Sequence, residues 1–106
     1  MIISFRRKAQ QVQGKILIVD AIATNRIILK VKLKKAYYDV AYAATMDDAI
    51  KATRAELPDL VICALALPDG GAADLCHALA QSPLTEHVPI IAIGCQAGAG
   101  VRMNTL

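Results

Sequence analysis

The sequence contains no tryptophan, and aromatic residues make up only 4% of its 106 residues. With so few large rings, packing must rest on Ala, Ile, Leu and Val, which suits an α/β domain with small residues between helices and sheet. No aromatic residue is interleaved with the lysines, and no zinc-finger or helix-turn-helix pattern is present. These absences argue against a nucleic-acid-binding function.

The sequence also lacks paired metal-binding cysteines and a secretion signal. The three cysteines (Cys63, Cys76 and Cys95) form no Cys-x-x-Cys pair, and their odd number predicts reduced thiols in a cytoplasmic protein. No N-terminal signal peptide is recognisable, and no apolar run is long enough to span a membrane. The spacing of His77 and His87 fits no zinc signature, so we interpret them as one helix-surface and one loop histidine.

Positive charge is concentrated in the first third of the chain. Residues 1–35 carry nine Lys or Arg and one acid, whereas residues 36–106 carry three Lys or Arg and eight acids. We interpret the basic part as a leader over residues 1–14, poorly ordered or a short helix, followed by a solvated helix face. Contact with an acidic partner or with nucleic acid is the alternative. The length allows one domain, and the apolar fraction of 56% predicts a well-buried core or an apolar surface that needs a partner.

Four apolar segments predict strands. The strand predicted over residues 15–19 contains the continuous apolar run 16–19, which is typical of a strand buried on both faces, and residues 59–67 and 88–93 have the same character. Residues 39–43 are short and mixed, as in an edge strand. In open parallel sheets the chemistry lies at the carboxyl ends of the strands, so Asp20 occupies the place of a binding site.

Helices are predicted between these strands. Thr45 begins one with a capping box, and Pro58 ends it; helical spacing returns over residues 72–81. Residues 21–36 are ambiguous, because their apolar positions alternate as in a strand, while Thr24 is a plausible N-cap. Strands that alternate with helices predict parallel βαβ units with right-handed crossovers.

Over residues 15–95 the chain resembles the receiver domain of two-component response regulators, which has the CheY-like fold. The resemblance implies a flavodoxin/CheY-like α/β domain with a parallel sheet in strand order 2-1-3-4, lacking the last strand and helix, with residues 96–106 as a C-terminal tail. It also favours a helix over residues 21–36. The finer likeness is to the N-terminal receivers of PleD-type diguanylate cyclases. The matching segments are residues 16–20, 25–26, 58–62, 67–70, 75–76 and 87–91, and for the finer likeness 25–26, 30–33 and 37–40.

The resemblance also implies a site that transfers a phosphoryl group from a histidine kinase to an aspartate, with Mg²⁺, a hydroxyl and a lysine. Asp20 matches the first acid of the metal pair, but the second acid falls on Ala21, the phosphoacceptor on Ala64 and the hydroxyl on Gly94, and the lysine has no counterpart. A methyl group cannot accept a phosphoryl group, and one carboxylate is a poor Mg²⁺ site. We therefore predict no cofactor and at most residual cation binding at Asp20. Asp69 is interpreted as a turn residue, with a compensating acid as the alternative.

These residues predict a pseudo-receiver that is not an enzyme and that acts by protein–protein interaction or dimerisation, linked to cyclic-di-GMP signalling. Without the last helix, apolar surface on strands one and three should lie open and favour a homo-oligomer or another protein partner. Arg26, Lys30 and Lys34 are the predicted interaction residues. The alternatives are an active phosphoacceptor that uses another acid and a basic nucleic-acid-binding domain. A nucleotide site is disfavoured, because the glycines after residue 93 lack the third glycine of a dinucleotide fingerprint.

Overall fold

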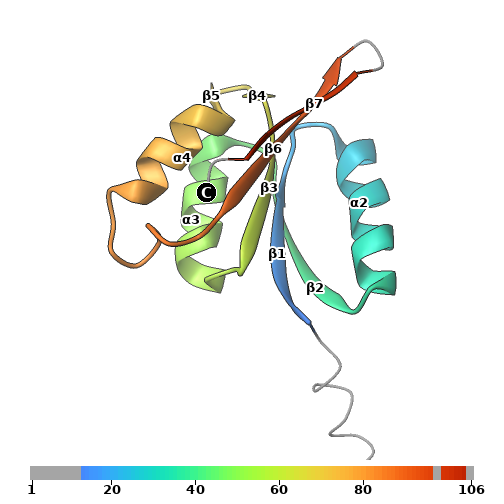
Figure 1. Ribbon diagram of the computed structural model, residues 1–106, viewed down its shortest axis with the longest axis horizontal. Coiled ribbons are helices and arrows are strands. Elements are labelled where there is room, and N and C mark those ends of the chain that lie inside the picture. The colour runs from blue at the N-terminus through green and yellow to red at the C-terminus, as the bar shows by residue number, and fades with distance from the viewer. Residues whose placement is uncertain (1–12, 97–98, 105–106) are drawn as a thin grey trace, which may run out of the picture.

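The computed structural model describes residues 13–96 and 99–104, and gives side-chain surroundings for residues 13–94. Its main element is a five-stranded sheet in the order β2-β1-β3-β6-β7 (Figure 1). The first four strands of this order are parallel, so the predicted order 2-1-3-4 is confirmed. The strands are β1 (Gly14–Val19), β2 (Tyr38–Ala43), β3 (Leu60–Ala64), β6 (Ile90–Gln96) and β7 (Ala99–Asn104).

The strand β7 lies within residues 96–106, which were predicted as a tail. It pairs antiparallel with β6, from Ile91 opposite Asn104 to Gln96 opposite Ala99. The segment has no clear apolar period, so sequence pattern alone did not indicate a strand. Backbone pairing to an existing sheet edge makes a strand here without such a pattern. Nearly all of the predicted leader (residues 1–12) lies outside the described residues.

In the described residues three helices cover the sheet, one on one face and two on the other (Figure 1). Helix α2 (Ala23–Lys35) lies alone on its face, while α3 (Met46–Glu56) and α4 (Ala72–Ala80) share the opposite face. The helix over residues 21–36 is therefore confirmed. In the described part of the chain, no helix has the length and apolar character needed to cross a membrane.

The two predicted N-caps differ. The Thr45 hydroxyl accepts a 3.1 Å hydrogen bond from the backbone N–H of Asp48 and caps α3, as predicted. The assignment of Thr24 is wrong, because Ile22 is the N-cap residue of α2 and Thr24 lies inside the helix. Among the described residues, no side-chain hydrogen bond caps α2; Asp20 Oδ1 instead accepts from the N–H of the N-cap residue Ile22 at 2.9 Å.

The predicted strand over residues 59–67 is interrupted. β3 ends at Ala64, the chain bends at Leu65, and β4 (Ala66–Leu67) pairs antiparallel with β5 (Gly70–Gly71). A Cβ atom on Gly71 would lie only 2.6 Å from the carbonyl oxygen of Leu65, so the close return of the chain requires glycine. The apolar run gave no sign of this bend, because its residues are apolar on both sides of it.

The two faces of the sheet are buried to different extents. On the α3/α4 face the strand residues belong to one buried cluster with side chains from both helices. On the α2 face, Ile16 and Ile18 of β1 are buried, but Ile62 and Ile93 of β3 and β6 are only half-buried. The apolar surface of strand three is partly exposed, as predicted. The prediction that strand one is also exposed is wrong, because α2 covers β1. The buried residues that the five-stranded sheet presents to the α3/α4 face are Leu17, Val19, Ala43, Val61, Cys63, Ile90 and Ala92.

Candidate functional site

The carboxyl edge of the parallel strands holds a pocket of about 200 Å³. Its lining includes Asp20, Ala21, Ala64 and Gly94, all of which were singled out from the sequence. Asp20 directly follows β1, Ala64 ends β3 and Gly94 lies in β6, so parallel pairing brings three distant segments to one edge. The structure therefore places the four matched positions together.

Asp20 supplies the only carboxylate among the described residues that line the pocket, and both of its oxygens have partners. Oδ1 accepts from the N–H of Ile22 at 2.9 Å, and Oδ2 accepts from the side-chain amide of Asn25 at 3.1 Å. The carbonyl oxygen of Asp20 accepts a 2.6 Å hydrogen bond from the guanidinium of Arg26. Asp20 thus organises the start of α2, a local role typical of a carboxylate bonded two residues ahead.

The pocket lacks the groups that phosphoryl transfer to a carboxylate requires. Two methyl groups and a glycine stand at the positions that the family pattern gives to acids and a hydroxyl. Mg²⁺ prefers octahedral oxygen ligands, and a single carboxylate already bonded to two donors does not fit it. In the described part of the chain, no three His, Cys, Asp or Glu side chains form a group able to hold a metal ion.

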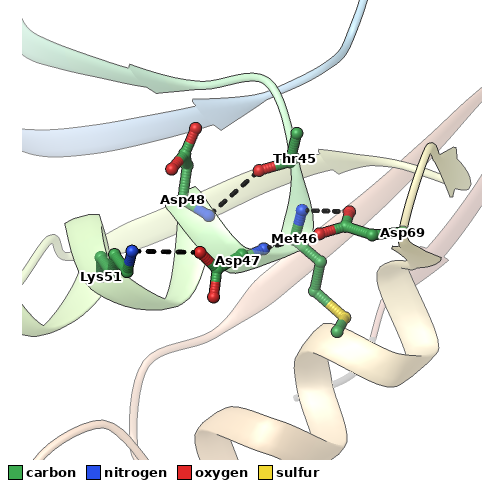
Figure 2. Close-up of polar contacts among 6 residues, drawn as sticks. All are labelled: Thr45, Met46, Asp47, Asp48, Lys51 and Asp69. Atoms are coloured by element: carbon green, nitrogen blue, oxygen red, sulfur yellow. Dashed lines mark hydrogen bonds and ion pairs between the residues drawn. The ribbon is translucent and has the colours of Figure 1, made fainter.

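Asp69 is the second acid considered from the sequence, and it lies on the two-residue turn between β4 and β5. Its carboxylate accepts hydrogen bonds from the backbone N–H groups of Met46 (2.7 Å) and Asp47 (3.1 Å) (Figure 2). These bonds lower the pKa of Asp69, because they stabilise the charged carboxylate. The turn position is confirmed, and the carboxylate serves the N-terminus of α3, a role that the sequence analysis missed.

The contact between Asp69 and the start of α3 has no local motif in the sequence. The acid lies 23 residues after Met46, so no capping-box spacing points to it. Figure 2 shows the local and the distant cap together, with Thr45 bonded to Asp48 and Asp69 bonded to the first turn of α3. Only the sheet topology, which brings the turn after β4 beside the start of α3, makes this contact possible.

Cys63 is a buried thiol that directly precedes Ala64 in the sequence. Burial, with a further contribution from the charge of Asp20, raises the pKa of Cys63 to about 12. Its Sγ donates to the carbonyl oxygen of Ala64 at 3.2 Å. The thiol is therefore protonated near neutral pH and is a poor nucleophile or metal ligand. Cys76 is a half-buried free thiol, and His77 and His87 are exposed on α4 and on a loop, as predicted.

The predicted interaction residues of α2 have different surroundings. Arg26 is bonded to the Asp20 carbonyl oxygen, and the ammonium of Lys30 lies 5.6 Å from the ring centre of Tyr42, within cation–π range. Lys34 is exposed. Arg26 and Lys30 are thus partly used within the domain, and an interaction role for the three residues stays a prediction.

Comparison with known proteins agrees with this geometry. The response regulator receiver domain family matches residues 16–105. The response regulator PleD of Caulobacter vibrioides is 31% identical over 93 residues, which is 88% of this chain but only 20% of PleD. The chain thus spans about one fifth of the length of that relative.

Solved structures show the same fold. A protein described as a response regulator of Chloroflexus aurantiacus has 35% identity and a TM-score of 0.71, with 74% of this chain and 65% of that chain covered. The non-phosphorylated HemR receiver domain of Leptospira biflexa has 31% identity and a TM-score of 0.69, with 82% and 68% covered.

Proposed function

Because this chain belongs to the response regulator receiver domain family, we propose that it acts in two-component signalling as a pseudo-receiver, through protein–protein contacts and without phosphorylation at the usual position. Receiver domains are generally signalling domains without enzymatic activity, and they interact with proteins in phosphorelays. A receiver that has lost the phosphoacceptor can still use its surfaces for such contacts.

One observation carries the proposal: the pocket at the carboxyl edge presents methyl groups from Ala21 and Ala64 where the family pattern has acids. An aspartyl phosphate needs a carboxylate nucleophile and metal-bound oxygens that offset the charge of the transferred group. The remaining acid, Asp20, is bonded to Ile22 and Asn25. In the described lining of this pocket, no carboxylate therefore stands at the acceptor position.

A link to cyclic-di-GMP signalling is the finer part of the proposal. Its support is the likeness of residues 25–26, 30–33 and 37–40 to the receivers of PleD-type diguanylate cyclases, together with the 31% identity to PleD. The partner on this view is a protein or a second copy of the chain, and cyclic-di-GMP itself needs no site in this domain.

The test is chemical phosphorylation of the 106-residue chain with acetyl phosphate and Mg²⁺, read by intact-protein mass spectrometry. We expect no phosphoryl adduct under conditions in which a receiver with an aspartate at the acceptor position is modified. NMR spectra with beryllofluoride and Mg²⁺ should likewise show no shifts around the pocket. An adduct that is lost in Asp20→Asn or Asp69→Asn would contradict the proposal and establish a phosphoacceptor that uses another acid.

A further inference from the structure

A groove lies beside α2, in addition to the pocket at the strand ends. It has a volume of about 160 Å³ and lies between α2 and the sheet. Ile28 and Leu29 line it from α2, and Ile62, Ala64 and Ile93 line it from β3 and β6. Nearly all of its lining is apolar, and its main polar groups, on Asp20 and Asn25, are bonded to each other.

The groove is open because one helix covers only part of this sheet face. Ile62 and Ile93 are half-buried, while their chain neighbours Val61 and Ala92 are fully buried under α3 and α4. On the helix, Ile28 is 49% exposed and Val31, three residues later, is 48% exposed. Covering these exposed apolar side chains would remove them from water, which is the main driving force of association.

The charged side chains of α2 are all positive, whereas Asp20, which lines the groove, is bonded to Asn25. Helix α2 carries Arg26 and four lysines and no acid. Lys32 and Lys35 follow Ile28 by four and seven residues, so they lie on the same flank of the helix as Ile28, toward its C-terminal end. Acidic side chains on a partner that extends from the groove along this flank would complement their charge.

We propose that the groove binds an amphipathic helix of a partner protein, with its apolar stripe on Ile28, Ile62 and Ile93 and its Asp or Glu residues toward Lys32 and Lys35. This deepens the proposed function, on which it rests, by stating the chemistry of the partner. Helix α2 has 13 residues, so a partner helix of similar length, roughly 20 Å at about 1.5 Å per residue, fits alongside it. Symmetric pairing with a second copy would bring two basic helix flanks together, and like charges disfavour it.

The experiment uses the complete 106-residue chain and two labelled helical peptides with the same Leu/Ala stripe. One peptide carries Glu on both sides of the stripe and the other carries Lys, and binding is measured by fluorescence anisotropy. We expect the Glu peptide to bind at least about ten-fold more tightly than the Lys peptide, with affinity that falls as salt is added. Equal binding of the two peptides, or no binding of either, would overturn the proposal.

Adjacent residues of α2 provide matched variants. Ile28→Glu should weaken binding of the Glu peptide by about ten-fold or more, because it puts a like charge in the groove. Ile27 is comparably exposed (58%) but lies on the opposite flank beside Tyr42, so Ile27→Glu should leave binding within about two-fold. Equal effects of the two substitutions would contradict binding in the groove.

Charge reversal gives a second, independent readout. Lys32→Glu should weaken binding of the Glu peptide and strengthen binding of the Lys peptide. Lys30→Glu, on the flank beside Tyr42, should have a much smaller effect on the binding of both peptides. A homodimer in light scattering that Ile28→Glu abolishes and Ile27→Glu preserves would show that a second copy occupies the groove, and would overturn the proposal. The phosphorylation assay separates the two inferences: an adduct refutes the pseudo-receiver, whereas missing peptide binding without an adduct refutes only the occupant of the groove.

Discussion

The carboxylate of Asp69 accepts a 2.7 Å hydrogen bond from the backbone N–H of Met46, and this contact ties the turn after β4 to the first turn of α3 (Figure 2). We expect Asp69→Asn to lower the midpoint of urea unfolding, because a neutral amide oxygen is a weaker acceptor at a helix N-terminus than a carboxylate. Asp48→Asn is the matched control. It removes a carboxylate from the first turn of α3 but leaves the bonds of Asp69 in place, so its effect should be smaller.

The same contact predicts a pH dependence. The folded-state pKa of Asp69 is lowered, so its stabilising contribution is fully present above the unfolded-state pKa of about 3.9 and is lost as the pH falls through the folded-state value. The stability difference between the natural chain and Asp69→Asn should therefore be constant near neutral pH and shrink below about pH 4. Urea unfolding followed by circular dichroism at several pH values measures it, and a difference that grows toward acid pH would contradict the assignment.

The two candidate N-cap threonines should respond differently to removal of the hydroxyl. Thr45 caps α3 through the N–H of Asp48, so Thr45→Ala should cost about 1 kcal/mol in the free energy of unfolding. Thr24 lies exposed inside α2, so Thr24→Ala should change stability little and in the favourable direction, since Ala has the higher helix propensity. Chemical denaturation of both variants checks the pair, and equal losses would show that Thr24 has a role the structure does not give it.

The sequence predicted the elements that depend on local pattern and composition. The apolar runs around residues 15–19 and 88–93, the Thr45 cap and the end at Pro58 all carry their signal within a few residues. Helix α2 could not be predicted this way, because its alternating apolar residues indicate a strand. The reason is visible in the structure: no residue of α2 is buried, so its surface is under little pressure to show a helical stripe.

The parts of the site that sequence reasoning missed depend on long-range contacts. The four pocket positions were found because the resemblance gave them in advance, and the parallel strands bring them to one edge. The bond from Met46 to Asp69 spans 23 residues and has no local motif. Helix α2 buries one face of β1 and leaves β3 half-exposed. This difference depends on where the helix packs against the sheet.

The unequal cover of the α2 face predicts a difference between two paired isoleucines. Ile18 and Ile62 are partners in the register of β1 and β3 and lie on the same face of the sheet. Ile18 is fully buried, so Ile18→Ala should cost about 2–5 kcal/mol. Ile62 is half-buried, and Ile62→Ala should cost less because part of the side chain already contacts water. Equal costs in urea unfolding would mean that the face is closed over β3 in solution.

Adding acids at two positions of the pocket at the strand ends should create a metal site. In the double variant Ala21→Asp and Ala64→Asp, two new carboxylates would share a pocket of about 200 Å³ with Asp20. Without a divalent cation their repulsion should lower the thermal midpoint, and Mg²⁺ should restore it by several degrees, because oxygen ligands then suffice and binding stabilises the folded state.

The matched variant with Asn at both positions has the same bulk without the charge and should not respond to Mg²⁺. The natural chain should also show no shift across the same titration, read by thermal unfolding in circular dichroism. An Mg²⁺-dependent rise in the natural chain equal to that of the double Asp variant would mean that Asp20 already binds the cation with ligands from elsewhere, and the pocket would then have to be reassigned as a working metal site.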